Sequence, residues 1–410
     1  MGNSNKIRII DLFSGCGGLT EGFMKTNKYQ EVAAVEWLKP QVETLRARLK
    51  SKWKKVASDE FVMHFDIQRE DELFSGWDND EKFASGKGLD YFVEKSKGVD
   101  VIVGGPPCQA YSIAGRVRDE DGMKNDYRNY LFEHYLSIVK KYQPKLFVFE
   151  NVPGILSARP GETPITKLIS DSFNEIGYVI CDDLGKYAVI NASDYGVPQN
   201  RKRVIILGVK KGVTDFPQEI IKKFYTKQLP KYSSSKKVSV KDSIGDLPPC
   251  IPIVDPLNQI MRISHETPEC LVSRHTPRYA NKRDIETFRM LAEDLASGKC
   301  EYNSKKISEL YEKKIGSRSP IHRYHVLRPD VPSTTIIAHL KKDGHRYIHY
   351  DPTQARTITI REAARLQSFD DDFQFLGAQG DAYQMIGNAV PPKLAKSIAM
   401  ALSDLFYTLK

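Results

Sequence analysis

The chain has 410 residues, 40% of them hydrophobic and 10% aromatic, with 61 Lys and Arg against 52 Asp and Glu. This composition excludes a disordered chain, and the length allows two or three domains with at least one large core. No stretch approaches the roughly 18 consecutive apolar residues of a membrane-spanning helix, and the first residues lack the apolar region of a signal peptide. We therefore expect a soluble protein that acts in the cytoplasm and does not bind a membrane.

The cysteines stand alone along the chain, at positions 16, 108, 181, 250, 270 and 300. Six cysteines are too few for a disulfide framework, and none belongs to a Cys-x-x-Cys pair, so we expect no metal site. A scattered cysteine is usually a small buried hydrophobe. A cysteine that carries chemistry must therefore be distinguished by its surroundings.

Short apolar runs alternate with helix-compatible segments over the first half of the chain. The runs occupy residues 7–13, 31–35, 99–103, 146–149 and 204–209. Between two of them, residues 130–142 repeat their apolar positions at helical spacing. Strands that alternate with helices predict an α/β fold with a parallel, doubly wound sheet.

Glycines and acidic residues follow the first strands of this predicted sheet, where ligands of such folds bind. The loop Ser14-Gly15-Cys16-Gly17-Gly18 follows the first strand, Glu36 and Trp37 follow the second, and Asp66 follows a probable third. Glu36 lies 19 positions after Gly17, a typical distance for an acid that binds ribose hydroxyls. The glycine spacing differs from that of dinucleotide-binding loops. The pattern predicts an adenosine-bearing ligand without a pyrophosphate, although the loop alone would suit any tight turn.

A second group of polar residues lies at the ends of the later strands. Cys108 follows the run 99–103 in Gly104-Gly-Pro-Pro-Cys-Gln and is a candidate nucleophile. Glu150 ends the next run, and Arg201 and Arg203 lie at the start of the last one. Taken singly, Glu150 would be a helix cap and the arginines would form surface ion pairs. Their convergence on one crevice favours an active site.

The excess positive charge lies in residues 211–350, which hold 25 Lys and Arg against 16 Asp and Glu and seven of the nine histidines. The rest of the chain holds 36 of each sign. This stretch is loop-rich, with one helical candidate at 283–296, and its charge suits contact with nucleic acid. A lysine-rich solvated surface would give the same balance. We expect a catalytic domain of residues 1–210 and 351–410 that closes around a smaller domain, 211–350.

Six segments resemble, in order, the motifs of the DNA (cytosine-5)-methyltransferase family. They are Asp11-Leu-Phe-Ser-Gly-Cys-Gly-Gly18, Gly105-Pro-Pro-Cys-Gln109, Glu150-Asn-Val152, Gln199-x-Arg201-x-Arg203, Arg356 to Phe369, and Gly387-Asn-Ala-Val390. The basic insert takes the place of the family's target-recognition domain, and Pro332-Ser-Thr-Thr-Ile336 is similar to a threonine motif of that domain. The resemblance implies a Rossmann-like, S-adenosylmethionine-dependent methyltransferase sheet with a loop-rich recognition domain.

The resemblance also implies a methyl donor, S-adenosyl-L-methionine, with S-adenosyl-L-homocysteine as the product. Phe13 and Trp37 would enclose the adenine, Glu36 would bind the ribose, and Asp66 would contact the adenine edge. The remaining positions that would shape this pocket are Gly15, Gly17, Asn388 and Val390.

The implied reaction occurs on a cytosine flipped out of double-stranded DNA. Cys108 would attack carbon 6, Glu150 would protonate ring nitrogen 3, and Arg201 with Arg203 would hold the base and the adduct. The segment 110–129 is similar to the family's mobile loop over the DNA. The residues expected to contact DNA are Gln109, Ser112, Arg116, Arg118, Arg323, Arg328, Thr335 and Arg346.

Other functions fit the sequence less well. A tRNA methyltransferase of the same fold would carry Cys-Phe-Thr, which is absent, and a catalytically silent relative would lack Cys108, Glu150 or the arginines. A nicotinamide oxidoreductase is disfavoured by the glycine spacing. The size and the single insert favour a monomeric restriction-modification enzyme with a partner endonuclease, and an orphan regulatory enzyme would have the same sequence features.

Overall fold

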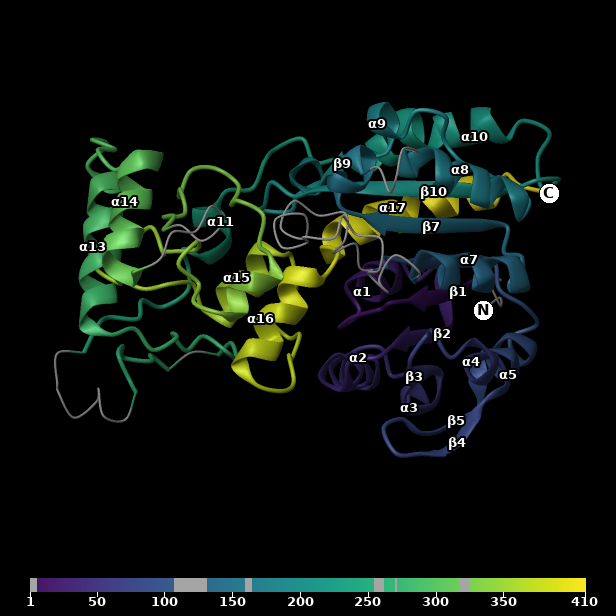
Figure 1. Cartoon of the computed structure of the whole chain (residues 1–410), viewed down its shortest axis with the longest axis horizontal. Coiled ribbons are helices and arrows are strands. Elements are labelled where there is room, and N and C mark those ends of the chain that lie inside the picture. Colours follow the sequence, from purple (N-terminus) through teal and green to yellow (C-terminus); the bar gives the residue numbers. More distant parts are fainter. Residues whose placement is uncertain (1–5, 107–130, 159–163, 254–261, 270, 317–323) are drawn as a thin grey trace. The chain divides into compact units, whose positions relative to one another are not determined.

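The computed structural model describes residues 6–106, 131–158, 164–253, 262–269, 271–316 and 324–410 (Figure 1). The chain forms two compact units. Unit 1 consists of Met1–Tyr195, Lys202–Ser235 and Val390–Lys410, and unit 2 consists of Gly196–Arg201 and Lys236–Ala389. None of the helices in the described segments is long and apolar enough to cross a membrane.

Unit 1 is built on one mixed sheet with the strand order β3-β2-β1-β6-β7-β10-β8, and β9 pairs with β10. The parallel strands are β1 (Ile7–Leu12), β2 (Tyr29–Glu36), β3 (Val62–His64), β6 (Val101–Gly104) and β7 (Leu146–Asn151). The antiparallel strands are β10 (Lys202–Lys210), β8 (Tyr178–Val179) and β9 (Val189–Asn191). The predicted α/β fold is therefore confirmed, with antiparallel strands added at one edge. Such mixed sheets are common because an edge strand can join in either direction.

The strand order reverses between β1 and β6, which pair directly. The chain moves outward from β1 to β2 and β3, and then returns to β6 on the other side of β1. In open α/β sheets this reversal opens a crevice beyond the carboxyl ends of the strands. The glycine loop after β1 and the segment after β6 both begin there.

Helices and one hairpin complete unit 1. The longer helices are α1 (Gly18–Met24), α2 (Lys39–Ser51), α5 (Gly88–Lys95), α7 (Leu131–Tyr142), α8 (Ile165–Glu175), α10 (Pro217–Lys223) and α17 (Pro392–Phe406). The shorter elements are α3 (Ser58–Phe61), α4 (Glu70–Ser75), α9 (Leu184–Tyr187) and the hairpin of β4 (Trp77–Asp80) and β5 (Ala84–Gly86).

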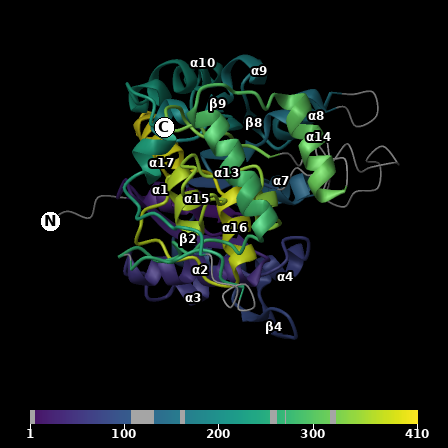
Figure 2. The same ribbon diagram turned by 90° about the vertical axis from the view of Figure 1, so that its left-hand side faces the viewer.

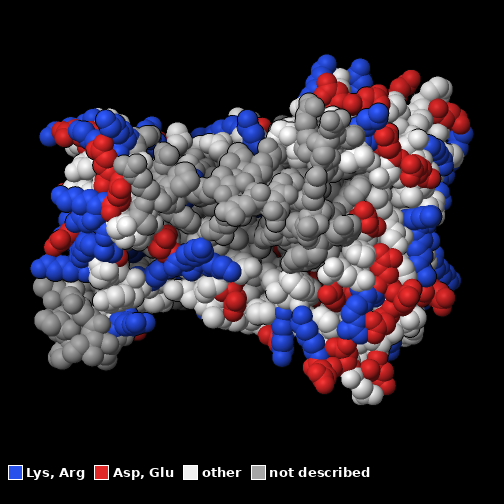
Figure 3. Space-filling view, viewed as in Figure 1, with Lys and Arg blue, Asp and Glu red and all other residues white. Residues whose placement is uncertain are grey.

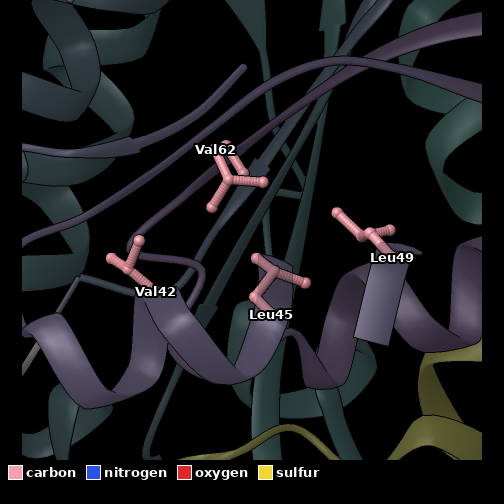
Figure 4. Packing of buried hydrophobic residues seen from close by; sticks show 5 residues of the cluster. Val42, Leu45, Leu49 and Val62 are labelled. Carbon is pink, nitrogen blue, oxygen red and sulfur yellow. The ribbon is translucent and has the colours of Figure 1, made fainter. Parts of the chain in front are cut away.

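Two close contacts fix the helices around the first strands. Val42, Leu45 and Leu49 on one face of α2 pack on Val62 of β3 (Figure 4). Gly17 has φ +89°, and a Cβ there would lie 2.5 Å from a methyl carbon of Leu45, so the glycine lets the loop approach α2. α17 approaches α1 just as closely, since a Cβ on Gly22 would lie 2.4 Å from that of Ala395.

Unit 2 has little regular structure beyond short helices. They are α11 (Val240–Ile244), α13 (Lys282–Ala296), α14 (Ser304–Ile315), α15 (Ile360–Leu366) and α16 (Gln379–Asn388), with a 3₁₀ turn, η6 (Ala338–Lys341). α13 and α14 lie side by side (Figures 1 and 2) and share a core that includes Phe288, Leu291 and Tyr311. Lys and Arg side chains alternate with Asp and Glu over this helix pair on the face shown in Figure 3.

Residues 351–389 pack within unit 2, together with the basic insert. α16 approaches η6 so closely that a Cβ on Gly387 would lie 2.4 Å from the amide nitrogen of Ala338. Segment 196–201 also belongs to unit 2, although β10 follows it directly in unit 1. The compact units therefore divide the chain at other positions than the domain boundaries expected from the sequence.

Candidate active site

An ion pair marks the end of β7. Glu150 lies opposite Ile205 of β10, and its Oε1 accepts a hydrogen bond from Nε of Arg203 at 2.8 Å. Nη1 of Arg203 also donates to the backbone oxygen of Lys202 at 2.8 Å. Both side chains are largely buried, and burial lowers the pKa of Arg203 while the charge of Glu150 opposes that effect. The second carboxylate oxygen, Oε2, lies close to the backbone of Gly105.

The backbone that leaves β6 passes beside this second oxygen. A Cβ on Gly105 would lie 2.6 Å from Oε2 of Glu150. The next residue, Pro106, accepts a hydrogen bond at its carbonyl from Nδ2 of Asn151 at 3.4 Å, and Oδ1 of Asn151 accepts from the Val152 amide at 2.8 Å. The segment that leads to position 108 is thus fixed against Glu150 up to Pro106. Outside the described residues lie Cys108, Gln109, Ser112, Arg116, Arg118 and Arg323.

A buried tyrosine of α7 connects the two strands that carry this site. The hydroxyl of Tyr135 lies 3.3 Å from the carbonyl oxygen of Ile102 in β6 and 3.1 Å from that of Val148 in β7. Its single proton can be shared between these two acceptors. Tyr135 lies in the segment 130–142, whose apolar spacing predicted a helix, but nothing in the pattern indicated that its hydroxyl would hydrogen-bond to the sheet.

Three backbone amides converge on the carboxylate of Glu36, at the end of β2. Oε2 accepts from Gly15 at 2.9 Å, and Oε1 accepts from Trp37 at 3.0 Å and Leu38 at 2.9 Å. Burial raises the pKa of Glu36, although these hydrogen bonds act in the opposite direction. Gly15 has φ +56°, and among the described residues no atom other than those of its chain neighbours lies within 4 Å of the position a Cβ would take. The structure therefore joins the glycine loop to the acid that follows the second strand.

A second carboxylate of β1 is incompletely paired. Asp11 is 2% exposed, its Oδ2 accepts from the hydroxyl of Thr20 at 2.6 Å, and its Oδ1 has no hydrogen-bond partner within the described part of the chain. Burial raises the pKa of Asp11 to about 7. A buried oxygen without a partner is costly unless a ligand or water completes it.

The polar groups at the ends of β1 and β2 suit S-adenosylmethionine. This molecule carries ribose hydroxyls, which need acceptors, and an ammonium and a sulfonium, whose positive charges favour acidic surroundings. The carboxylates of Glu36 and Asp11 supply acceptors and negative charge, and Gly15 leaves the backbone open. The residues present at the ends of β1 and β2 therefore fit such a ligand.

Trp37 stands partly exposed beside this loop, with 44% of its surface accessible. Nζ of Lys82, from the β4–β5 hairpin, lies 5.3 Å from the centroid of its ring, and the His64 ring nitrogen Nε2 lies 3.0 Å from its carbonyl oxygen. Sequence reasoning missed both neighbours, because neither is close to Trp37 in a recognisable motif. Phe13 follows β1 with φ +57°, and Asp66 follows β3, where its Oδ1 accepts from the amide of Gln68 at 3.1 Å.

The other predicted residues divide between the units. Val390 is buried in unit 1, whereas Asn388 ends α16 in unit 2. Arg201 is 1% exposed in unit 2, where Nη1 donates to the Ile336 carbonyl at 2.7 Å and Nη2 to the Gly387 carbonyl at 3.0 Å. The two predicted arginines therefore belong to different units, and Arg203 forms the ion pair with Glu150.

The predicted DNA contacts that the structure describes lie in unit 2. Arg328 is exposed, Arg346 is half-buried, and the hydroxyl of Thr335 donates to the carbonyl of Asn200 at 2.7 Å. In the described ranges, no group of three or more His, Cys, Asp or Glu side chains is arranged to hold a metal ion.

Comparison with known proteins identifies the family. The model of the C-5 cytosine-specific DNA methylases matches residues 7–404. The type II methyltransferase M.Bpa9945I of Bacillus paralicheniformis is 34% identical, over 97% of this chain and 98% of its own. The type II methyltransferase M1.HphI of Haemophilus parahaemolyticus is 31% identical, over 96% of this chain and 86% of its own.

Solved structures agree with these sequence matches. A structure described as a prophage-encoded DNA modification methyltransferase of E. coli superposes with a TM-score of 0.60 at 26% identity, over 98% of this chain and 100% of the other. The Dnmt2 methyltransferase of S. pombe, at 13% identity and a TM-score of 0.55 over 98% of this chain and 99% of its own, shares the fold. The chain therefore belongs to the C-5 cytosine-specific DNA methylase family, enzymes that use S-adenosylmethionine to methylate carbon 5 of cytosine in DNA.

Proposed function

We propose that this enzyme methylates one cytosine of a specific duplex sequence through a covalent adduct with Cys108, as the modification enzyme of a restriction-modification system. Unit 1 performs the chemistry, and unit 2 recognises the target. The observation that supports this assignment most directly is the Glu150–Arg203 pair, which lies against Gly105 on the segment leading to Cys108.

The roles of the residues follow from the poor reactivity of cytosine. Carbon 5 is a weak nucleophile until the Cys108 thiolate adds to carbon 6 and makes the base an enamine. Glu150 gives a proton to ring nitrogen 3, and Arg203 stabilises the carboxylate that remains. After carbon 5 has been methylated, it loses its proton to a base or water, and Cys108 leaves by elimination.

S-adenosylmethionine supplies an electrophilic methyl group when it is bound. Glu36 accepts hydrogen bonds from the ribose hydroxyls, Phe13 and Trp37 enclose the adenine, and Asp66 binds its edge. The remaining positions of the pocket are Gly15, Gly17, Asn388 and Val390. Support comes from the convergence of the Gly15 amide on the Glu36 carboxylate.

DNA contacts come from both units in this proposal. The segment after β6 contributes Gln109, Ser112, Arg116 and Arg118, and unit 2 contributes Arg323, Arg328, Thr335 and Arg346. The curated relatives named above are type II methyltransferases, which supports a partner endonuclease for the same site. We place the enzyme in the bacterial cytoplasm as a monomer.

The test is base-resolution mapping of 5-methylcytosine in a plasmid that encodes the enzyme, in a host without cytosine methylation. Cys108→Ala is expressed in parallel, with its protein level and folding checked. The expected result is methylation at one short sequence by the wild type and none by the variant. Methylation of tRNA in place of DNA, or full activity of Cys108→Ala, would overturn the proposal. An endonuclease blocked by this methylation would distinguish a restriction-modification role from an orphan regulatory one.

A further inference from the structure

Two segments far apart in the sequence pair with each other inside unit 2. Residues 198–201 run parallel to residues 333–335, with a bridge between Gln199 and Ser333. The Ser333 amide donates to the Pro198 carbonyl at 3.0 Å, and the Asn200 amide donates to the Ser333 carbonyl at 2.8 Å. Segment 333–337, which contains the threonine motif, is therefore aligned on the segment that carries Gln199 and Arg201.

The side chains of Gln199 and Arg201 hold both polar backbone atoms of Ile336. Oε1 of Gln199 accepts from the Ile336 amide at 2.9 Å, and Nη1 of Arg201 donates to the Ile336 carbonyl at 2.7 Å. Gln199 is 0% exposed and Arg201 1% exposed. Since buried backbone groups need partners and this stretch lies in no sheet, these side chains replace a neighbouring strand. They fix the backbone next to Thr335.

The ends of two helices brace the same side chains. Nε2 of Gln199 donates to the Leu366 carbonyl at 3.2 Å and to the side-chain oxygen of Gln367. Nε2 of Gln367 donates to the Ala389 carbonyl at 2.6 Å, and Nη2 of Arg201 donates to the Gly387 carbonyl at 3.0 Å. α15 and α16 therefore fix the position from which Gln199 and Arg201 hold segment 333–337.

Tyr347 holds the same segment by two further hydrogen bonds. Its hydroxyl donates to the Thr335 carbonyl at 2.8 Å and accepts from the Ile337 amide at 3.0 Å. With the contacts of Gln199 and Arg201, three successive residues of the segment have backbone atoms bound to buried side chains. This is more restraint than a solvated loop needs, and it suits a segment whose side chains must meet a ligand in one register.

We propose that Gln199 and Arg201 are positioning residues that hold segment 333–337 in register for reading the target DNA. The inference rests on the proposed contact of Thr335 with DNA. Two terminal nitrogens of the Arg201 guanidinium already donate to protein carbonyls, and lysine cannot span two such acceptors in this fixed geometry. Loss of either side chain frees the backbone that presents Thr335 to the DNA.

The test separates target recognition from methyl transfer in four proteins. Arg201→Lys and Tyr347→Phe each remove contacts to segment 333–337, and Lys202→Ala, an exposed neighbour, is the matched control. Each variant is compared with the wild type for KM of cognate DNA, for methylation of sites that differ by one base pair, and for the single-turnover rate at saturating DNA. Thermal melting shows that each variant is folded.

Arg201→Lys is expected to raise the KM for DNA about tenfold or more and to methylate near-cognate sites, with the single-turnover rate within about threefold of wild type. Tyr347→Phe should change KM and site preference in the same direction by about three- to tenfold. This second variant keeps the inference testable if Arg201→Lys does not fold.

A single-turnover rate that falls about a hundredfold in Arg201→Lys, with an unchanged KM, would overturn the inference, because it would show a contact with the reacting base. Wild-type KM and site preference in folded Tyr347→Phe would overturn it as well. Absence of DNA methylation by the wild type and Lys202→Ala would contradict the proposed function, and this inference would fall with it.

Discussion

Two buried polar side chains, one in each unit, have different kinds of partner. In unit 1, Asp11 in β1 keeps one carboxylate oxygen, Oδ1, without a hydrogen-bond partner in the described part of the chain. In unit 2 the backbone is mostly irregular, and side chains such as Arg201 bind carbonyls that no strand reaches. The carboxylate of Asp11 is therefore available to a ligand, whereas the guanidinium of Arg201 holds irregular backbone in place.

The same contrast extends to proton binding. In unit 1, burial raises the pKa of Asp11 and of Glu31 to about 7. In unit 2, burial lowers the pKa of His265 and of His349 to about 4. Burial alone would raise the pKa of Glu362, but Arg356, bound to it by two hydrogen bonds of 2.7 Å, brings it to about 2. Acid therefore acts in opposite directions on these buried carboxyl groups of unit 1 and these buried histidines of unit 2.

Glu150→Gln tests most strongly whether the carboxylate at the end of β7 serves chemistry. The amide keeps an oxygen for Arg203 but cannot transfer a proton to the base. We expect the single-turnover methylation rate to fall about 10²–10⁴-fold, with little change in DNA affinity. Glu94→Gln, an exposed carboxylate in the same unit, is the control and should behave as wild type. A wild-type rate in Glu150→Gln would show that this carboxylate of unit 1 does not serve chemistry, and the comparison of the two units would lose its main support.

Acid should unfold unit 2 before unit 1. A histidine in the unfolded chain has a pKa of about 6.5, whereas the pKa of His265 and of His349 in the folded protein is about 4. Between pH 6.5 and 4 these two histidines are therefore protonated in the unfolded chain and neutral in the folded protein, which favours unfolding. Unit 2 then loses about 3 kcal/mol per histidine over that window. Asp11 and Glu31 bind protons at a higher pH in the folded protein than in the unfolded chain. As the pH falls from 7 to 4, their protonation removes the cost of burying a charge, and this stabilises unit 1.

Hydrogen exchange followed by mass spectrometry, from pH 7 to 4.5, measures the two units separately. Unit 2 amides should lose protection first. His349→Asn is the matched variant, because an asparagine oxygen can still accept from the Asp351 amide that His349 Nδ1 binds at 3.1 Å. This variant should make the hydrogen-exchange protection of unit 2 less dependent on pH. Simultaneous loss of protection in both units would break the comparison.

Gly105→Ala should impair catalysis by crowding and not by removing a reactive group. The added methyl would lie 2.6 Å from Oε2 of Glu150, which Arg203 holds in place through the other oxygen. We expect kcat to fall about 10- to 100-fold, because small misplacements of a catalytic group cost this much. Gly380→Ala in α16 is the control, because a Cβ there would meet no described atom within 4 Å outside its own helix backbone. Unchanged kcat would show that Glu150 has room to move.

Lys82→Ala is expected to have the smallest effect. Nζ of Lys82 lies 5.3 Å from the ring centroid of Trp37, and an exposed cation–π contact contributes about 0.5–1 kcal/mol. The Kd for S-adenosyl-L-homocysteine, measured by calorimetry, should therefore rise about two- to fivefold. Lys95→Ala, on the nearby helix α5, should leave this Kd unchanged. An equal loss in both variants would assign the effect to net charge and not to Trp37.

Local patterns in the sequence predicted the parts of the fold that depend on local burial. The apolar run 146–149 is the core of β7, and a capping box of Thr359 and Glu362, a local pattern, begins α15. α14 was missed although Asn303 caps it, because its lysines obscure the apolar spacing of residues 307–315. A local pattern therefore predicts an element well when the apolar residues of that element are the ones that become buried, and poorly when charged residues interrupt the apolar spacing.

Long-range arrangements could not be predicted in this way. The sequence placed Arg201 and Arg203 together, two positions apart, and nothing local distinguishes them. Their different positions depend on distant partners. Arg201 binds the carbonyls of residues 336 and 387, whereas Arg203 binds the carboxylate at position 150. The proximity of Glu150 and Arg203 followed from strand order, whereas the pairing of 198–201 with 333–335 had no sequence signal. The catalytic roles themselves remain predictions.

The packing of α17 on α1 has a consequence for the order of synthesis. Tyr29 of β2 donates its hydroxyl proton to the carbonyl of Ala399 at 2.6 Å, so the first strands of unit 1 depend on residues translated after all of unit 2. A nascent chain on the ribosome therefore completes unit 2 while α1 still lacks its partner helix. A chain released early, anywhere before residue 392, would lack α17 and keep apolar surface of α1 exposed.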